Sequence, residues 1–353
     1  MAKTFTMKLL ILTQKVDKND DVLGFFHGWL QEFAKNCEKV FVVALKVGEY
    51  ELPPNVFVYS LGKENGESKS KYIIKFLRYI FSLRNEYDSV FIHMNQVYVL
   101  LGGIFWRLWN KKTALWYVHR QNGLDLKIAE KLVNYVFTSS PESFTVKSKK
   151  VIYIGHGVDS SKLTCDGTVG PADKVKIVHV GRISPIKDLV TLVLAGEILS
   201  KKIPNLLIEF YGKTGNDADE KYLNAIKLII KEKELGRIIS FRGSIPNTEI
   251  SKVYCSATIS ANMAPKGGWD KAVIESLMAK CPVFASNLAL KPVFGEYSNK
   301  FLFEHKNPLE LANKIESFLA ENEKEKIINN LREHAIKEYD IKNLVKKITS
   351  KLS

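Results

Sequence analysis

Two cations and a glycine follow a short apolar run near the middle of the chain, in the order Gly181-Arg182-Ile183-Ser184-Pro185-Ile186-Lys187-Asp188. The run before them, 176–180, predicts a buried strand, and the apolar-periodic segment 189–199 predicts a helix. Gly181 permits close backbone approach, and a helix N-terminus attracts anions. With Arg182 and Lys187 added, this loop suits a diphosphate. On spacing alone, two solvated loop cations explain the pattern equally well.

A second glycine-rich loop stands further along the chain, with the sequence Pro265-Lys266-Gly267-Gly268-Trp269-Asp270-Lys271. It leads into a predicted helix of apolar and small residues that carries one acid, Glu275, and the run 281–285 after it predicts a buried strand.

Together the two motifs resemble those of the retaining family 4 glycosyltransferases, which have the two-domain GT-B fold. That family has a Gly-Arg-Leu-x-x-x-Lys-Gly-like loop and an acidic Glu-x7-Glu motif that continues as Glu-Ala-Met-Ala-x-Gly-x-Pro-Val. In this chain the continuation reads Glu275-Ser276-Leu277-Met278-Ala279-Lys280-Cys281-Pro282-Val283. The match in order and spacing covers most of residues 175–335. The resemblance implies that Arg182 and Lys187 bind the diphosphate of a nucleotide-sugar donor and that Glu275 holds the ribose hydroxyls.

The chain departs from the family at the residue that normally contacts the donor sugar. Gly267 stands where the first Glu of the acidic motif is expected. Asp270 either supplies the missing carboxylate or caps the helix that follows, and the sequence leaves both readings open. By position, Gly268, Trp269 and Lys271 lie near the sugar and the phosphates. We also expect Gly243, which follows the predicted strand 238–242, in the donor site.

The N-terminal half carries weaker signals. Gly24 looks like the family's glycine-rich loop before its first helix, where backbone N–H groups face the donor phosphates. His27 is placed to meet the acceptor, with a surface histidine as the alternative. His119, at the end of the predicted strand 114–119, falls where the family has a histidine beside the transferred sugar. His93, with Asn95 nearby, is a similar candidate for contact with the acceptor, because the ends of parallel strands lie on the ligand side of such sheets.

Short apolar runs alternate with helical patterns throughout, which favours parallel sheets built from βαβ units. The fold class we expect is α/β, with two doubly wound, Rossmann-like domains that face a central cleft as in GT-B proteins. The N-terminal, acceptor-side domain is expected over 1–165 and the nucleotide-sugar domain over 175–337. The polar segment 160–173 is the best linker candidate. The C-terminal segment 327–352 is predicted to be helical with a break near Tyr339-Asp340, and the helix 338–353 is expected to pack back on the first domain. The predicted strands are 8–12, 40–45, 56–59, 89–93, 114–119, 135–139, 151–154, 175–180, 206–211, 238–242, 257–260 and 281–285.

Composition agrees with a globular protein of two domains, since the chain has 353 residues, of which 46% are hydrophobic and 25% charged. The net charge of +14 is unusual, but it is spread evenly over both halves, and no nucleic-acid motif accompanies it. No nucleic-acid partner is therefore expected.

The four cysteines lie far apart in sequence, which we interpret as ordinary thiols in a reducing cytosol. The expected location is cytoplasmic.

Two basic, aromatic segments, 69–84 and 102–112, predict helices that either pack on the sheet or lie on an anionic membrane, where a lipid-linked acceptor is found. If these helices lie on a membrane, the protein is expected to be cytoplasmic and attached peripherally to the inner membrane face.

The resemblance implies transfer of a hexose-type unit from a nucleoside diphosphate sugar, with a UDP- or GDP-sugar expected, to an acceptor hydroxyl with retention of configuration. The acceptor would be a glycan, a glycolipid or a lipid-linked sugar, as in polysaccharide biosynthesis. No cofactor and no metal are expected, and the pair Asp217-Ala218-Asp219 lacks the surroundings of a metal motif. Alternative functions are a GT-B epimerase or phosphorylase, or a catalytically weak nucleotide-sugar-binding relative.

Overall fold

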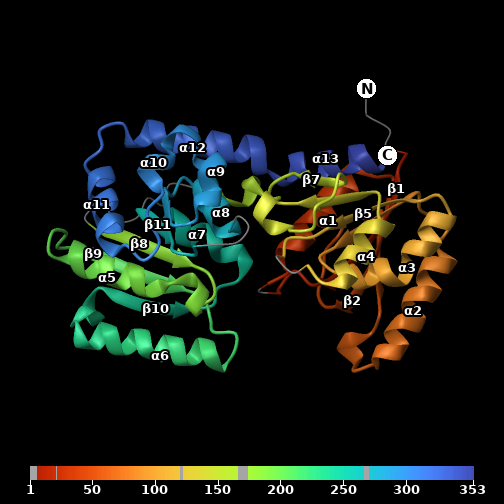
Figure 1. Ribbon diagram of the computed structural model, residues 1–353, viewed down its shortest axis with the longest axis horizontal. Coiled ribbons are helices and arrows are strands. Elements are labelled where there is room, and N and C mark those ends of the chain that lie inside the picture. The colour runs from red at the N-terminus through yellow and green to blue at the C-terminus, as the bar shows by residue number, and fades with distance from the viewer. Residues whose placement is uncertain (1–5, 21, 120–121, 166–173, 266–269) are drawn as a thin grey trace. The chain divides into compact units, whose positions relative to one another are not determined.

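The computed structural model describes residues 6–20, 22–119, 122–165, 174–265 and 270–353. Within these ranges the chain forms two compact units, one of residues 1–157 with 341–353 and one of residues 158–340. Each unit contains one parallel sheet with helices on both faces (Figure 1). The expected α/β class with two doubly wound sheets is therefore confirmed. None of the helices described combines the length and the hydropathy that a bilayer crossing requires.

The sheet of the first unit has the strand order β3-β2-β1-β4-β5-β6-β7. Its strands are β1 (Lys8–Val16), β2 (Lys39–Val47), β3 (Val56–Ser60), β4 (Ser89–His93), β5 (Lys112–Trp116), β6 (Tyr135–Thr138) and β7 (Val151–Tyr153). Its helices are α1 (Phe25–Asn36), α2 (Lys69–Ser82), α3 (Gln96–Leu108), α4 (Leu124–Leu132) and α13 (Ile341–Leu352).

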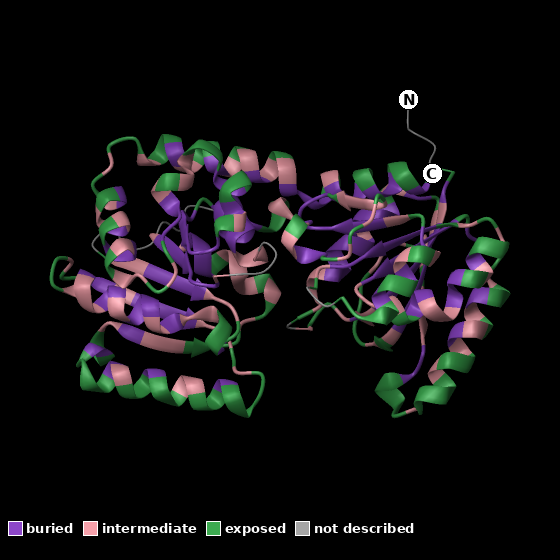
Figure 2. Cartoon of the chain, in the orientation of Figure 1, coloured by how far each residue is buried: buried purple, intermediate pink, exposed green. Residues whose placement is uncertain are grey.

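Alternation along β1 divides the core of this unit into two layers. Leu9 and Ile11 pack into a cluster with α1 and α13, whereas Leu10 and Leu12 pack into a cluster with α2, α3 and α4. Successive side chains of a strand point to opposite faces, so a continuous apolar run predicts a sheet that is covered on both sides. Both layers are drawn as buried in Figure 2.

The sheet of the second unit has the order β10-β9-β8-β11-β12. Its strands are β8 (Val175–Val180), β9 (Leu206–Tyr211), β10 (Ile239–Gly243), β11 (Ile259–Asn262) and β12 (Val283–Ala285). Its helices are α5 (Leu189–Ser200), α6 (Asp217–Glu232), α7 (Ile250–Cys255), α8 (Lys271–Met278), α9 (Lys291–Phe294), α10 (Ser298–Phe301), α11 (Pro308–Leu319) and α12 (Lys324–Tyr339). All strand pairs are parallel, with β8 in the centre.

The chain passes into the second unit at Gly157–Val158, earlier than the polar segment 160–173 that the sequence favours as linker. Val158 and Leu163 are both buried in the core of the second unit. The backbone N–H of Val158 also donates to the carbonyl of Tyr339 at 3.0 Å. Because these contacts already anchor residues 158 and 163 in the second unit, the boundary between the two units lies before the polar segment 160–173. Residues 166–173 lie outside the described ranges.

The cysteines differ from the sequence-based expectation. Cys165 and Cys255 form a disulfide that ties the segment after Leu163 to the end of α7, so the expectation of four free thiols is wrong for this pair. Cys37 and Cys281 are free and buried, and burial raises the pKa of each thiol to about 12.

The C-terminal helical region is broken at Asp340, as the sequence predicts, and α13 then packs against α1 in the first unit. Leu344 and Ile348 of α13 are buried in the layer that covers one face of the sheet. Because this helix closes that layer, its apolar side should contribute strongly to the stability of the first unit.

Replacement of the buried Ile348 by Ala should lower the free energy of unfolding by about 2–5 kcal/mol, because it leaves a cavity in this layer. Urea unfolding monitored by tryptophan fluorescence measures the change, since Trp29 lies in the same cluster. The matched control is Lys347→Ala on the exposed side of α13, which should change stability by less than about 0.5 kcal/mol. Equal effects of the two substitutions would contradict the packing of α13.

Candidate functional site

The first predicted site loop lies between β8 and α5, as the strand–loop–helix pattern indicates. Backbone hydrogen bonds join it to the neighbouring loops: Gly181 N–H donates to the carbonyl of Tyr211 at 2.9 Å, and Ile183 N–H donates to that of Lys213 at 3.1 Å. The N–H of Gly212 in turn donates to the carbonyl of Gly243 at 2.8 Å. The loops after β8, β9 and β10 thus form one connected layer at the carboxyl edge of the sheet, where ligands bind in open α/β folds.

Two glycines make this layer possible. Gly181 and Gly212 have φ angles of 154° and 153°, which side chains with a Cβ rarely adopt. A Cβ at Gly212 would lie 1.9 Å from the carbonyl oxygen of Gly181. The two loops therefore approach closely only because residue 212 has no side chain.

Arg182 leaves this layer with a largely exposed side chain that lies near an acid on α6. Its Nε lies 4.0 Å from Oδ2 of Asp219, a buried residue. The same oxygen accepts the backbone N–H of Gly215 at 3.0 Å. Asp219 belongs to the Asp-x-Asp pair noted in the sequence, and here it lies near a cation. In the part of the chain that the structure describes, no cluster of His, Cys, Asp or Glu side chains could hold a metal ion.

Lys187 ends a short turn before α5, and its ammonium pairs with Oδ2 of Asp270. Asn262, at the end of β11, donates from Nδ2 to the same oxygen at 2.9 Å. Asp270 is the N-cap of α8, where its side chain accepts the N–H of Ala272. Of the two readings left open by the sequence, capping is therefore observed, and the carboxylate also holds Lys187. Contact of Asp270 with a sugar stays a prediction.

The electrostatics of this pair favour the charged form. Burial by itself would raise the pKa of Asp270, but the Lys187 ammonium and the Asn262 amide outweigh it and hold that pKa well below its usual value. Lys187 is therefore fixed in one place by an ionised partner at neutral pH.

Glu275 lies on α8 and is buried, with Oε1 2.8 Å from Nζ of Lys271 one turn earlier. This burial argues against an ordinary acid on a helix surface. Tyr254 of α7 is also buried, and its hydroxyl donates to the carbonyl of Ala272 at 3.0 Å. Burial and, to a smaller extent, the charge of Glu275 raise the pKa of Tyr254 well above its usual value, so this tyrosine stays protonated.

His179 is a residue of this edge that sequence reasoning missed. It is buried in β8, and its Nδ1 lies 2.9 Å from the carbonyl oxygen of Ala261, which can only accept, so Nδ1 is the protonated nitrogen. Nε2 has no hydrogen-bond partner among the described residues. Burial lowers the pKa of His179 to about 4, which keeps the ring neutral. The only sequence signal was a polar residue inside the apolar run 175–180.

The remaining predicted donor residues fall into two groups. Gly243 ends β10 with φ 76°, and its carbonyl receives the hydrogen bond from Gly212. Gly267, Gly268 and Trp269 lie outside the described residues.

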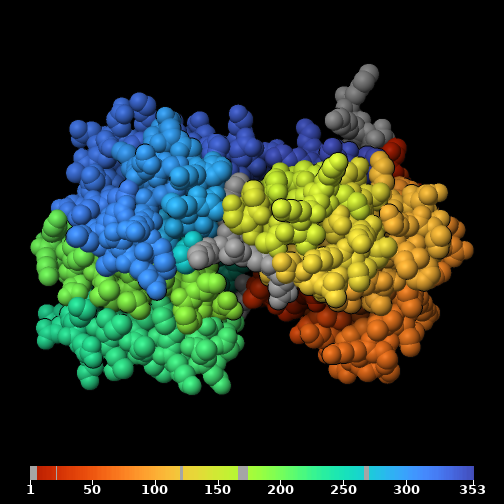
Figure 3. All heavy atoms as spheres, viewed as in Figure 1, coloured from red at the N-terminus to blue at the C-terminus, as the bar shows by residue number. Residues whose placement is uncertain are grey.

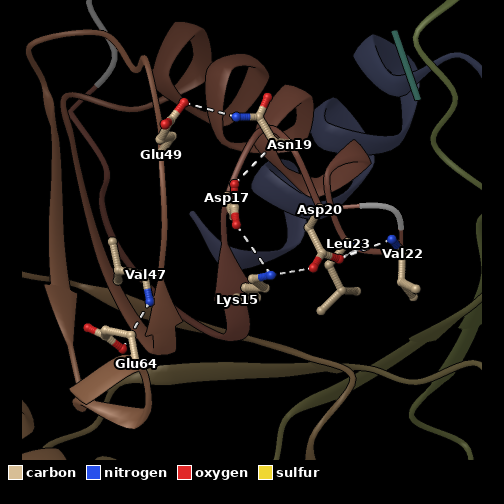
Figure 4. Close-up of polar contacts among 9 residues, drawn as sticks. All are labelled: Lys15, Asp17, Asn19, Asp20, Val22, Leu23, Val47, Glu49 and Glu64. Atoms are coloured by element: carbon tan, nitrogen blue, oxygen red, sulfur yellow. Dashed lines mark hydrogen bonds and ion pairs between the residues drawn. The ribbon is translucent and has the colours of Figure 1, made fainter. Parts of the chain in front are cut away.

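In the first unit, the loop after β1 is held by its own charged side chains (Figure 4). Lys15 pairs with Asp17 at 3.3 Å and also with Asp20. The Asp20 carboxylate accepts the N–H groups of Val22 and Leu23 at 3.0 and 2.7 Å. Burial works to raise the pKa of Asp20, but these hydrogen bonds, led by that from Lys15, lower it.

This arrangement bears on the predicted phosphate contact at Gly24. The N–H of Gly24 donates to the backbone carbonyl of Asp20 at 3.0 Å. The amides of the two preceding residues donate to the Asp20 carboxylate, so an acid already engages them. The observed loop does not present free amides at Gly24.

Two predicted acceptor histidines lie inside the first unit instead. His27 is buried, and its Nε2 accepts the backbone N–H of Glu51 at 3.0 Å. His93 is buried at the end of β4, stacked on Phe26 with ring centroids 3.9 Å apart. Its Nδ1 lies 3.2 Å from Oγ1 of Thr13, and burial lowers its pKa to about 3. In this structure both side chains are engaged inside the unit. Their contact with an acceptor stays a prediction.

Asn95 and His119 follow the ends of β4 and β5. Asn95 caps α3, because its Oδ1 accepts the N–H of Val97 at 3.0 Å. His119 is exposed and lies beyond β5, which ends at Trp116, not at residue 119 as predicted. Of the predicted histidines in this unit, His119 is the one on the surface.

Comparison with known proteins identifies a family match over the second half of the chain. The family model described as "Glycosyl transferases group 1" matches residues 168–349. No curated protein matches the chain in sequence.

Solved structures match over almost the whole length. The chain is similar to the Anabaena protein HepE, whose crystal structure was determined in complex with UDP, with TM-score 0.76 and 18% identity over 98% of this chain and 99% of that one. It is also similar to sucrose-phosphate synthase from Thermosynechococcus elongatus, with TM-score 0.78 and 16% identity over 98% of each chain. A glycosyltransferase from Rickettsia africae gives TM-score 0.76 and 15% identity over 99% of this chain and 98% of that one. At these identities the likeness concerns the fold, which is the two-domain GT-B arrangement expected from the sequence.

Replacement of Gly212 by Ala should destabilise the second unit by about 1–3 kcal/mol or more, because the new methyl group meets the carbonyl of Gly181. Chemical unfolding measures the loss. The matched control is Gly236→Ala, where nothing lies within 4 Å of a Cβ. A Gly212 variant as stable as the control would contradict the close approach of the two loops.

The Lys187–Asp270 pair predicts a specific pH dependence. A carboxylate whose pKa is lowered by folding stabilises the protein above its unfolded pKa, here 3.8, and this contribution is lost as pH falls toward the folded value. The loss of stability caused by Asp270→Asn should therefore be largest near neutral pH and shrink below about pH 4. Unfolding free energies across this range test it, with the exposed Asp217→Asn as control. A loss that is independent of pH would contradict the ionised pair.

Proposed function

The chain belongs to the family of glycosyl transferases group 1, and from this premise we propose that it moves a hexose-type unit from a nucleoside diphosphate sugar to an acceptor hydroxyl. The Anabaena relative HepE was crystallised with UDP and with UDP-glucose, which supports a nucleotide-sugar donor here. We propose a UDP- or GDP-sugar as that donor, with retention of configuration at the transferred carbon.

The observation that carries the proposal is the paired placement of two cations in one loop at the carboxyl edge of the second sheet. Lys187 is held by Asp270, and Arg182 lies 4.0 Å from Asp219. A diphosphate leaving group gains negative charge as the bond to the sugar breaks. Cations that are already fixed stabilise this charge without having to reorganise, which is the most effective form of electrostatic catalysis.

The bond changes in the proposed reaction balance without a further reactant. The bond between the anomeric carbon and the diphosphate oxygen breaks, and the acceptor oxygen forms a bond to the same carbon. The proton of the acceptor hydroxyl passes to an oxygen of the departing phosphate, on the face from which that phosphate leaves. Arg182 and Lys187 are the catalytic residues in this scheme, because they would touch the group whose charge changes.

Other residues of the edge receive supporting roles. We propose that Glu275 accepts hydrogen bonds from the ribose hydroxyls of the donor, with its carboxylate held by the ion pair to Lys271. Asp270 is a positioning residue that acts through Lys187 and through the start of α8. Gly181 and Gly243 contribute backbone to the same edge.

For the acceptor we propose a hydroxyl of a glycan, a glycolipid or a lipid-linked sugar, with the exposed His119 of the first unit beside the transferred sugar. A cytoplasmic role in polysaccharide biosynthesis stays a prediction.

One observation favours a second candidate function, that of a nucleotide-sugar-binding relative with weak catalysis. Gly267 stands where the family has an acid. Tight binding of a donor without turnover over a panel of acceptors would support that candidate.

The alanine variants Arg182→Ala and Lys187→Ala should each lower the rate of transfer by about a hundredfold or more, since each charge contributes a few kcal/mol in the transition state. A thermal-shift screen with UDP- and GDP-sugars first identifies the donor, and release of the nucleoside diphosphate then measures the rate. Arg237→Ala, an exposed cation on the same unit, is the matched control. A folded double variant that retains full transfer activity would overturn the proposed role of the loop.

A further inference from the structure

Three helices cover the same face of the sheet in the first unit. Phe76 of α2, Trp106 of α3 and Leu126 of α4 are all buried in one core layer beneath them, and the helices follow one another along one side of the unit in Figures 1 and 3. Rings also join α2 to α3, since Phe81 lies 4.9 Å from Phe105 between centroids. The outer sides of these helices, called here the α2–α4 face, therefore form one neighbouring set.

Large apolar side chains stand on this outer side. The exposed fractions are 65% for Ile74 on α2, 59% and 73% for Ile104 and Leu108 on α3, and 77% and 51% for Leu124 and Ile128 on α4. Helical spacing puts each of them on the side opposite to the buried residues of its own helix. Sheet packing therefore does not account for them.

Several strongly exposed large apolar side chains therefore lie on neighbouring helices of one face. Single exposed leucines need no explanation, but contiguous apolar patches mark interaction sites. Helix α3 is apolar on its inner and outer sides alike, and Arg107 is its only charged residue. By contrast, α6 carries Asp, Glu and Lys on its outer side, and Leu228 is its one strongly exposed large apolar residue in the described structure.

The charges on the same helices are mostly of one sign. Helices α2 and α3 contain no acid. The two acids of α4 already have partners: Asp125 accepts a hydrogen bond from Gln96 at 2.6 Å, and Glu130 accepts one from Ser148 at 2.6 Å. The cations on the three helices are Lys69, Lys71, Lys75, Arg78, Arg107, Lys127 and Lys131. Of these, Lys75 pairs with Glu67 at 2.8 Å.

We propose that the α2–α4 face docks on the surface of an anionic lipid bilayer. Apolar side chains on the outside of a helix enter the boundary between headgroups and acyl chains, and neighbouring Lys and Arg side chains meet the lipid phosphates. The mixture of exposed Leu and Ile with cations fits this boundary, whereas a purely basic face would suit a soluble polyanion. The proposal rests on the surface of the first unit and not on the transfer reaction.

Co-sedimentation of the full chain with vesicles tests the docking. One set consists of phosphatidylcholine, and the other also contains phosphatidylglycerol at about one part in three. The chain should bind the anionic vesicles, and binding should weaken as salt rises from about 0.1 M to about 0.5 M. The double variant Ile104→Ser/Leu108→Ser should lower the partition coefficient by about tenfold or more, because two apolar anchors are lost. The charge reversal Lys71→Glu/Arg78→Glu should also lower it.

The matched control is Leu228→Ser/Leu309→Ser, which removes two comparably exposed apolar residues from the second unit and should leave vesicle binding unchanged. Thermal midpoints and donor-induced thermal shifts should stay at wild-type values in the Ile104/Leu108 variant, which separates this proposal from the proposed transfer reaction. No binding to anionic vesicles, equal binding to both vesicle types, or equal loss in the control variant would each overturn the docking surface.

Discussion

The candidate site depends on one steric constraint, the close approach of Gly181 and Gly212. The two backbones are near enough that a Cβ at residue 212 would overlap the carbonyl oxygen of Gly181. This approach lets the loops after β8 and β9 share hydrogen bonds, and it places Arg182 beside Gly215 and Asp219. A larger residue at 212 would separate the loops, and Arg182 would then move away from Gly215 and Asp219.

Carboxylates from distant parts of the chain lie beside the two cations of the loop, and the closer pair is Lys187 with Asp270. Asp219 comes from the start of α6 and Asp270 from the cap of α8, and each also binds a backbone N–H of its own loop or helix. A carboxylate that accepts a backbone N–H has little rotamer freedom left, so its own negative charge is held in a defined place. The acids beside Arg182 and Lys187 are thus part of the architecture of the sheet edge, which explains why they sit at helix starts.

The sequence predicted the parts of this structure that depend on local pattern. Both sheets, the order of the motifs along the second unit and the break at Asp340 follow from apolar periodicity and loop chemistry. The errors arise where long-range packing decides. His27 and His93 looked like ligand-side residues because they lie near a glycine or end a strand, yet both are buried: His93 stacks on Phe26, and His27 accepts the backbone N–H of Glu51. Likewise, spacing along the chain could not reveal that Cys165 meets Cys255, or that Val158 is already anchored in the second core.

The two most buried histidines also constrain the chemistry of transfer. His93 and His179 each end or precede the end of a central strand, where a general base would be expected, but burial lowers their pKa values to about 3 and about 4. Such rings are neutral at physiological pH and poor proton acceptors, because their charged forms lack solvation. A base with a pKa this low contributes little to removal of a proton from a sugar hydroxyl. Neither ring is thus suited to act as the base, which agrees with the proposed transfer of the acceptor proton to the departing phosphate, whose basicity rises as the bond breaks.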